Sequence, residues 1–353
     1  GASERGHVEF DHRFLSGAAQ ISLSAWHHTG YSYGEELNLG AAGVEALKLV
    51  TIVIATLALA AALPAQAQPG AARWVTLGTQ GVPIPLKTRS QPANVLLTGD
   101  GAYVVDAGDG TSEQLAKADV SLQQVKAVVL SHLHFDHTAR LLGIVSVRRR
   151  TNITSPLTIY GPPGTRTLVD GILAAMGPAV QAGYAYPGEF KTPFQPGVTV
   201  VEIRDGATFE LGSTHVTAAK NTHYTFTPGS ADDRAFESLA FRFDAPGRAI
   251  AYTGDTGPSP AVERLAQGAD LLVAEMIDFD RTVAEIRRVS PILPASAMAG
   301  ITIHLRDHHL TPKQVGELAR AAGVKSVVVT HLSAPAITAA RAAEYLREIG
   351  EAY

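Results

Sequence analysis

Short apolar runs alternate with amphipathic segments along most of the chain. The runs have the length and β-branched content of buried strands, and the longer segments have the spacing of helices. Hairpins come first and strand–helix alternation follows, in two successive halves. This order predicts two sheets with helices outside them, in one α/β domain over residues 73–353. The predicted strands cover 74–78, 94–98, 102–106, 127–131, 157–160, 198–203, 215–219, 239–243, 249–253, 271–274 and 327–330, and the main predicted helices cover 112–118, 165–176, 259–267, 312–322 and 338–349.

The first 67 residues depart from this pattern. Residues 1–46 are rich in Gly, Ser and His and have weak periodicity. Residues 47–67 then place Lys48 before an apolar run and end in Ala65-Gln66-Ala67, which is typical of a secretory signal peptide. The apolar run is shorter than the roughly 20 residues of a membrane span. An uncleaved anchor or a helix packed on the domain is the alternative.

We therefore interpret residues 1–46 as a leader of uncertain origin, most simply an artefact of the start site. We expect the natural protein to begin near Lys48 and to mature after Ala67. The mature form is then expected to be periplasmic or secreted, with no integral membrane domain once the signal is removed.

The composition narrows the class of protein only slightly. The chain has 353 residues, a formal net charge of -4 and 46% hydrophobic residues, which is an ordinary balance for a globular protein. It has no cysteine, so a disulfide framework and thiolate metal ligands are excluded. No basic stripe typical of a nucleic-acid groove stands out, and we interpret Arg148-Arg149-Arg150 as a solvated loop.

The most informative stretch is Ser131-His132-Leu133-His134-Phe135-Asp136-His137, which follows a buried-strand pattern at 127–130. A tight turn there could bring His132 and His134 to one metal ion, and Asp136 and His137 to a second. Neutral imidazole and carboxylate are the ligands that zinc takes when thiolates are absent. A polar loop without a metal is the alternative, but this full pattern at a strand end rarely arises by chance.

Three further candidate ligands, His223, Asp255 and His331, also follow predicted strands. Ligand sites in α/β proteins gather beyond strand ends, and Gly254 beside Asp255 lets the backbone approach a metal closely. Any one of these side chains could be an ordinary surface or core residue. Together with the central motif they predict a dinuclear metal site. His215 lies within a predicted strand and is interpreted as structural, whereas His304 and His308 stay ambiguous.

Two other features bear on chemistry. His309 directly precedes a helix that Thr311 could cap and Pro312 could begin, so it could protonate a leaving group or simply be exposed. Residues 177–197 form a long segment with no regular pattern, and such segments near a site are often binding loops. Its aromatic side chains could line an aryl pocket or merely pack the loop; they are Tyr184, Tyr186, Phe190 and Phe194.

Taken together, these motifs resemble the metallo-β-lactamase superfamily over residues 73–350, and most of all its ribonuclease Z branch. The matching pieces are VVDAGDG with Asp106, SHLHFDH, His223, TGDTG with Asp255, and HLTPKQVGELARAAGVKSVVVTHLS with His309 and His331. The resemblance implies a four-layer αββα sandwich. It places one zinc on His132, His134 and His223, a second on Asp136, His137 and His331, and Asp255 between them. It also implies a proton-donating role for His309 and an outer, loop-fixing role for Asp106.

Two departures from the branch affect the expected substrate. The branch pairs the proton-donating histidine with a Glu three residues before the bridging Asp, where this chain has Tyr252. Its long tRNA-gripping arm is replaced by the shorter segment 177–197. Together with the signal-peptide pattern, these departures lead us to expect a small-molecule ester substrate rather than tRNA. Because the branch is often dimeric, a homodimer is a further expectation.

The expected function is metal-dependent hydrolysis by a hydroxide that two divalent metal ions, most simply zinc, activate and Asp136 orients. Phosphoesters are the first expected substrates: phosphodiesters, phosphotriesters or, by extension, aryl sulfates. A β-lactamase acting on β-lactam amides is the second reading. A metal-binding protein without catalysis is the third, although such proteins usually lose one or more ligands.

Overall fold

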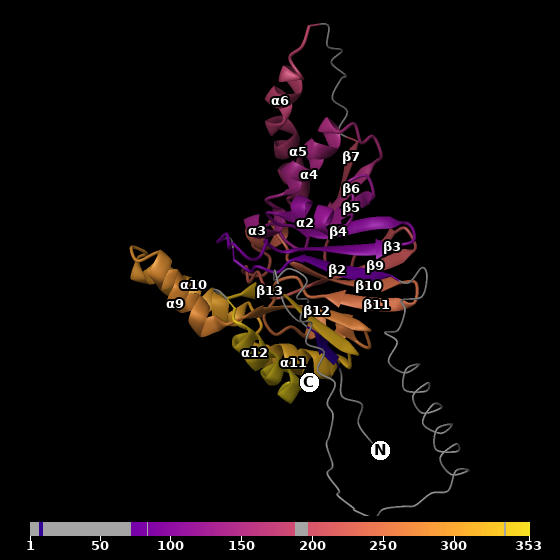
Figure 1. Cartoon of the computed structure of the whole chain (residues 1–353). Helices are drawn as coiled ribbons and strands as arrows, with labels where there is room; N and C mark the ends of the chain where they lie inside the picture. Colours follow the sequence, from indigo (N-terminus) through magenta and orange to yellow (C-terminus); the bar gives the residue numbers. More distant parts are fainter. Residues whose placement is uncertain (1–6, 10–71, 83, 188–196, 335–336) are drawn as a thin grey trace, which may run out of the picture. The chain divides into compact units, whose positions relative to one another are not determined.

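The computed structural model describes residues 7–9, 72–82, 84–187, 197–334 and 337–353. Two β-sheets pack against each other within these residues, and helices cover their outer faces (Figure 1). The predicted four-layer αββα architecture is confirmed.

The first sheet has six strands in the order β2-β3-β4-β5-β6-β7. Neighbours are antiparallel from β2 to β4 and parallel from β4 to β7. Parallel neighbours bring their carboxyl ends to one edge of the sheet. The strands are β2 (Arg73–Gly78), β3 (Ala93–Thr98), β4 (Gly101–Ala107), β5 (Val125–Val129), β6 (Leu157–Gly161) and β7 (Val198–Glu202).

The second sheet has the order β1-β13-β12-β11-β10-β9-β8. Its neighbours are antiparallel from β8 to β11 and parallel from β11 through β12 and β13 to β1. The strands are β1 (His7–Glu9), β8 (Thr208–Leu211), β9 (Thr214–Lys220), β10 (Leu239–Ala245), β11 (Arg248–Tyr252), β12 (Leu271–Ile277) and β13 (Ser326–Ser333).

Helices α2 to α6 follow strands of the first sheet, and α7 to α12 those of the second (Figure 1). They are α2 (Thr111–Lys117), α3 (Phe135–Thr138), α4 (Leu141–Arg150), α5 (Thr165–Ala175), α6 (Gly177–Ala182), α7 (Ala231–Ala235), α8 (Pro260–Ala266), α9 (Phe279–Val289), α10 (Ala295–Asp307), α11 (Pro312–Ala322) and α12 (Ala339–Ala352). The start predicted for α11 is confirmed, because Thr311 and Gln314 form a reciprocal capping box.

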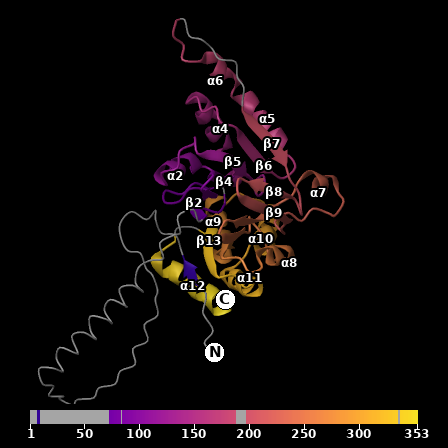
Figure 2. The same ribbon diagram turned by 90° about the vertical axis from the view of Figure 1, so that its right-hand side faces the viewer.

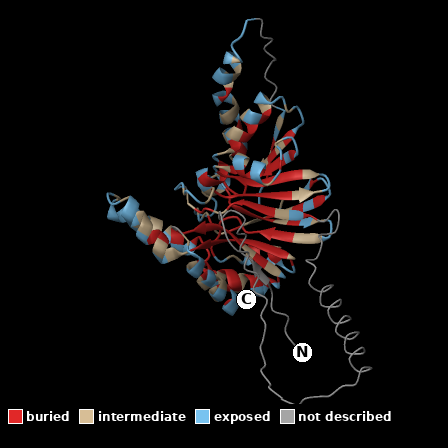
Figure 3. Ribbon diagram, in the orientation of Figure 1, coloured by how far each residue is buried: buried red, intermediate tan, exposed pale blue. Residues whose placement is uncertain are grey.

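The central core lies between the two sheets, where Phe241, Phe243 and Tyr252 of one sheet pack with Leu96 and Val105 of the other. The strands are buried over most of their length, whereas the α9–α10 hairpin is exposed toward its tip (Figure 3). Because both faces of these strands are buried, the strands appear in the sequence as continuous apolar runs. The paired sheets thus form a rigid support for the loops at their edges.

The structure differs from the predicted elements in several places. Residues 278–307, for which no element was predicted, form α9 and α10, and β8 and α7 were also missed. The solvated loop predicted at Arg148–Arg150 is wrong, because all three residues belong to α4. Arg148 is buried in α4 and donates hydrogen bonds to the carbonyls of Leu122, Val125 and Ser155, because three nearby backbone acceptors replace water for its guanidinium.

The leader is described only at His7–Glu9, which pair with β13. The signal-peptide-like segment 47–67 lies outside the described residues. Within the part of the chain that the structure describes, no helix combines the length and apolar character that a bilayer span requires.

Candidate metal centre

Strand ends from both sheets bring the predicted ligands together. The loop after β5 carries His132, and α3 continues it with Asp136 and His137. From the other sheet, the loop after β9 carries His223, the turn after β11 carries Asp255, and β13 itself carries His331. All of these side chains are buried.

The carboxylate of Asp255 lies at the centre of the group. Its Oδ2 atom is 2.9 Å from Nε2 of His331 and 3.4 Å from Nε2 of His137. The same oxygen is 3.9 Å from Nε2 of both His132 and His223. One oxygen therefore lies within 4 Å of four imidazole nitrogens, which is the position of a group shared between two clusters of ligands.

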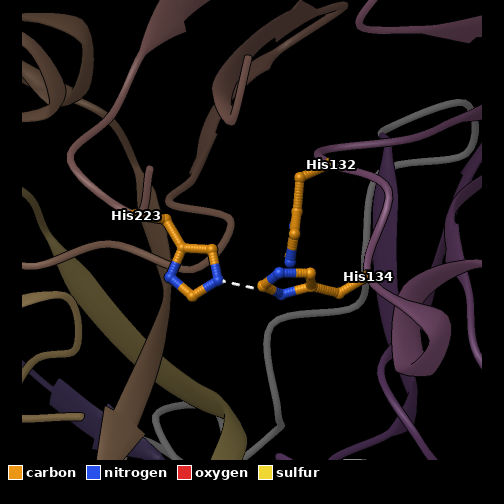
Figure 4. A group of neighbouring side chains, drawn as sticks. All are labelled: His132, His134 and His223. Atoms are coloured by element: carbon orange, nitrogen blue, oxygen red, sulfur yellow. Dashed lines mark hydrogen bonds between the residues drawn. The ribbon is translucent and has the colours of Figure 1, made fainter. Parts of the chain in front are cut away.

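One cluster consists of His132, His134 and His223, whose rings converge from two segments (Figure 4). Nε2 of His223 lies 3.1 Å from Nδ1 of His134. Two nitrogens bound at about 2.0–2.1 Å to one tetrahedral zinc lie roughly 3.3 Å apart, so this spacing fits two ligands of a single ion. The second cluster consists of Asp136, His137 and His331, with Nε2 of His331 3.6 Å from Oδ2 of Asp136.

Hydrogen bonds on the far side of the rings orient three of the histidines. His137 donates from Nδ1 to Asp106, His223 from Nδ1 to the carbonyl of His308, and His132 has Nδ1 3.0 Å from the Ser131 hydroxyl. Each ring therefore turns its Nε2 atom toward the centre, as outer partners of metal-binding histidines do.

Unpaired buried atoms test whether a cation fits. Nε2 of His132, Nε2 of His137 and Oδ1 of Asp255 are buried without a hydrogen-bond partner in the described part of the chain. Leaving such an atom unpaired costs about 1–3 kcal/mol each, and nitrogen and carboxylate donors suit a divalent ion such as zinc. The residues present therefore fit two divalent cations.

Electrostatics divides the histidines into two classes. Burial and the neighbouring imidazoles of His137 and His223 hold the pKa of His132 well below its ordinary value. Burial acts in the same direction on His331, but the carboxylates of Asp255 and Asp136 outweigh it and raise the pKa of His331 to about 10. Asp255 and Asp106 likewise raise the pKa of His137 well above its ordinary value despite burial. Without a cation, protons on His137 and His331 balance the buried carboxylates.

Asp106, at the end of β4, holds the motif loop in place. Its carboxylate accepts hydrogen bonds from the Ser131 backbone N–H at 2.7 Å, the Ser131 hydroxyl at 2.8 Å, His137 at 2.9 Å and the Tyr252 hydroxyl at 2.6 Å. Its backbone has a positive φ of 58°, and His331 has one of 39°. Such strained non-glycine residues cluster at functional sites.

Glu275 is a site residue that the sequence reasoning missed. Its Oε2 atom is 3.0 Å from Nδ1 of His309, and its Oε1 accepts hydrogen bonds from the backbone N–H groups of Thr256 and Leu310. Burial raises the pKa of Glu275 although His309 opposes it. The carboxylate that the resemblance placed at the position of Tyr252 therefore comes from β12. The available signal was a single acidic residue within the apolar run LLVAEMI.

The remaining histidines differ in their distance from the centre. His309 is buried beside the centre, with its ring stacked on that of His331 at 5.7 Å. His304, from α10, lies 5.0 Å from the ring of His223, and burial together with His309 lowers its pKa to about 4. His308 has Nδ1 2.7 Å from the Thr222 carbonyl, and His215 pairs with Glu210 on β8, away from the cluster.

The predicted aryl pocket does not form from the described residues of segment 177–197. Tyr184 and Tyr186 are each 57% exposed, and Tyr184 packs its ring under the guanidinium of Arg150 at 3.4 Å. They follow α6, which lies apart from α3 in Figure 1. Phe190 and Phe194 lie outside the described residues.

Residues 102–332 match the family described as the beta-lactamase superfamily domain. The chain belongs to this superfamily. Its curated relatives include proteins named Ribonuclease Z. The one from Mycobacterium bovis BCG Pasteur is 30% identical over 73% of this chain and 85% of its own length, and that from Mycolicibacterium gilvum is 31% identical over 73% and 83%.

Solved structures of superfamily members share the fold. The metallo-β-lactamase fold protein YhfI from Bacillus subtilis has a TM-score of 0.55 and 17% identity, over 80% of this chain and 92% of its own. The short form of human tRNase Z has a TM-score of 0.51 and 22% identity, over 73% of this chain and 92% of its own. The predicted resemblance to the superfamily and to ribonuclease Z is confirmed, and the chain is a hydrolase of this superfamily.

The expectation that tRNA is not a substrate is corrected by these relatives. At 30% identity over 73% of the chain, they are named Ribonuclease Z, and one neighbour in fold is named tRNase Z. The expectation rested on Tyr252 in place of a Glu, on residues 47–67, which lie outside the described residues, and on the short length of segment 177–197. Glu275 supplies the carboxylate that Tyr252 lacks. None of these features excludes RNA as a substrate.

Proposed function

We propose that this protein is a phosphodiesterase that uses two divalent metal ions, most simply zinc, and that RNA is among its substrates. The observation that carries the proposal is the position of Asp255 Oδ2 within 4 Å of four imidazole nitrogens, between two clusters of ligands. The relatives named Ribonuclease Z support the choice of a phosphodiester.

We assign the ligands as the two clusters suggest. His132, His134 and His223 would hold one ion, Asp136, His137 and His331 the other, and Asp255 would be shared by both. Two such ions lower the pKa of a water molecule to about 7 and stabilise negative charge on a phosphoryl oxygen. The exposed member, His134, leaves one side of the centre open to a substrate.

Asp136 and His309 take the remaining roles. The carboxylate of Asp136 lies among the ligands, 3.6 Å from His331 and 4.0 Å from His137, where it can accept a hydrogen bond from the attacking water and orient it. His309 lies on another side, beside His223 and His331. From there it can protonate the departing oxygen, while Glu275 fixes the ring through Nδ1 and leaves Nε2 for the proton transfer.

A substrate panel tests the proposal. The full chain, loaded with zinc, is assayed with a precursor tRNA, a bis-nitrophenyl phosphodiester, a phosphotriester, an aryl sulfate and a chromogenic cephalosporin. We expect cleavage of the RNA and of the bis-aryl diester, loss of both on chelation and recovery on adding zinc. Turnover of the cephalosporin alone would overturn the phosphodiesterase assignment.

Two variants test whether hydrolysis depends on the metal centre. Asp136→Ala should abolish hydrolysis of every substrate in the panel. His215→Ala removes an exposed imidazole from β9, where its partner is Glu210, and should leave turnover unchanged. An active Asp136→Ala protein would refute the mechanism. Metal analysis of the purified protein should show close to two ions per chain, and no bound metal would favour a binding-only protein.

A further inference from the structure

We propose that Tyr224, Phe226 and Phe236 form a binding surface for a planar aromatic substituent of the substrate, a nucleobase or an aryl group. We call these three residues the aromatic row. The inference rests on the proposed function, since it concerns the part of a phosphodiester that extends beyond the scissile phosphate.

The aromatic row begins at the metal centre. The ring of Tyr224 lies 5.2 Å from that of His134 and 5.8 Å from that of His132. Phe226 follows at 5.4 Å from Tyr224, and Phe236 at 6.2 Å from Phe226. The row thus leads outward from His134, the exposed ligand, along the segment between β9 and the end of α7. The α7 loop projects at the right in Figure 2.

Gly164 lies between the far end of the row and the metal motif. A Cβ atom added at Gly164 would lie 2.9 Å from Cδ1 of Leu133 and 3.5 Å from Cε1 of Phe236. Leu133 is the residue between His132 and His134, so the row follows one side of the motif. A side chain at position 164 would intrude between Leu133 and Phe236, and Gly164 also has a positive φ of 95°.

Exposure and charge indicate what the row would bind. Phe236 is 40% exposed, and Tyr224 and Phe226 are half-buried. At the N-terminus of α5, beside Gly164, the N–H groups of Gly164 and Arg166 are not free for a ligand, because they already donate to Glu202 at 2.9 and 3.0 Å. A pair of divalent cations would favour an anionic group at the metal end. An uncharged, flat group suits the aromatic end, since stacking on aromatic side chains is tolerant of the base identity.

Binding of phosphomonoesters to the zinc-loaded full chain tests the inference by calorimetry. The probes are phenyl phosphate, adenosine 5′-monophosphate, cyclohexyl phosphate and methyl phosphate. We expect the two planar probes to bind about tenfold more tightly than methyl phosphate, in line with the lower range for stacking of one base. Cyclohexyl phosphate should stay close to methyl phosphate. A larger gain for the adenosine probe assigns the row to nucleobases, and a larger gain for the phenyl probe assigns it to smaller aryl groups.

Variants then locate the effect. Phe236→Ala and the more conservative Phe236→Leu should each remove most of the gain for planar probes and leave methyl phosphate binding unchanged. Tyr186→Ala, a change at an exposed tyrosine that follows α6, apart from α3, is the matched control and should retain the gain. Thermal unfolding checks that each variant folds; since Phe236 is 40% exposed, at least the leucine variant should do so.

The outcomes separate this inference from the proposed function. Equal binding of phenyl and methyl phosphate by the unsubstituted chain would overturn the aromatic row, whether or not phosphodiesters are cleaved. Equal binding of cyclohexyl and phenyl phosphate would overturn the preference for planar groups. A gain that Phe236→Ala and Phe236→Leu both remove would support the row, even if the substrate panel failed and the proposed function fell.

Discussion

Oε2 of Glu275 and Nδ1 of His309 lie 3.0 Å apart, and both side chains are buried. Glu275 comes from β12 and His309 from the turn before α11. The same carboxylate also binds the backbone of Thr256, next to Asp255. The buried carboxylate of Glu275 thus connects the turn that carries Asp255, the candidate shared ligand, with His309, the proposed proton donor.

The first prediction concerns that proton donor. His309→Ala should lower kcat by about 10²- to 10⁴-fold on RNA, whose departing alkoxide needs a proton. The loss should be much smaller on a nitrophenyl diester, because nitrophenolate leaves without one. Glu275→Gln, a positioning change, should show the same dependence on leaving group with a smaller amplitude. Equal losses of kcat on both substrates would contradict the assignment and indicate a structural role.

The second prediction concerns Asp106. Its carboxylate orients His137 and accepts a hydrogen bond from the buried Tyr252 hydroxyl. Asp106→Asn should weaken zinc binding by about 10- to 100-fold, as loss of an outer partner of a metal-binding histidine does. Tyr252→Phe removes only the hydroxyl, and should lower the free energy of unfolding by about 1.5–3 kcal/mol with little change in zinc affinity. Competition with a chelator and urea unfolding measure the two quantities; unchanged zinc affinity in Asp106→Asn would refute this role.

The third prediction concerns protons. Without a cation, Asp255 and Asp136 raise the pKa of His331 to about 10 against the effect of burial, and the pKa of His137 is also well above its ordinary value. Both rings therefore carry protons at pH 7, and binding a cation must displace them. Zinc affinity should rise with pH up to about pH 10, by up to about tenfold per unit for each proton released. Calorimetry in two buffers of different ionisation enthalpy counts these protons, and a count of zero would be the contrary result.

The fourth prediction concerns the turn that carries Asp255. Gly254 has a φ of 57°, and a Cβ atom there would lie 2.6 Å from the Leu239 carbonyl oxygen. Gly254→Ala should displace Asp255 and reduce the zinc content below two ions per chain. Gly268→Ala is the matched control, because Gly268 has a φ of 63° but no neighbour within 4 Å of the added atom. It should lose stability alone, by about 1 kcal/mol. Equal zinc contents in the two variants would show that the turn does not position the ligand.

The fifth prediction concerns residues 48–67, which lie outside the described residues. If they act as a signal peptide, the chain expressed in a secreting host should be exported and should begin at Gln68. N-terminal sequencing of the exported protein measures this. A mature N-terminus well before Gln68 would exclude cleavage at Ala67.

Local signals in the sequence predicted much of the fold. The start of α11 was predicted correctly because Thr311, Pro312 and Gln314 cap the helix through neighbouring residues alone. Buried strands such as β5 are apolar on both faces and short, so their pattern is visible without knowledge of the partners. The hairpin α9–α10 lacked such a signal because most of its residues are exposed or half-buried, and few of them join a core.

Contacts between distant segments were beyond that reasoning. Arg148 looked like a surface charge until three carbonyls from other segments enclosed its guanidinium. Tyr184 and Tyr186 looked like pocket residues from composition, but they follow α6, which lies apart from α3. Tyr224, Phe226 and Phe236 had no recognisable pattern, because they line up only through the path of the loop between β9 and β10.

By itself, the sequence determined the two-sheet architecture and the chemical types of the candidate ligands. Buried strands and the HLHFDH motif can both be recognised from short contiguous stretches of residues. Only the tertiary structure decided that one oxygen of Asp255 lies within 4 Å of four imidazole nitrogens, that Glu275 rather than residue 252 meets His309, and which aromatic side chains border the centre. These relationships join residues up to about two hundred positions apart. They depend on which strand ends the packing of two sheets brings to one place, and no local pattern encodes that choice.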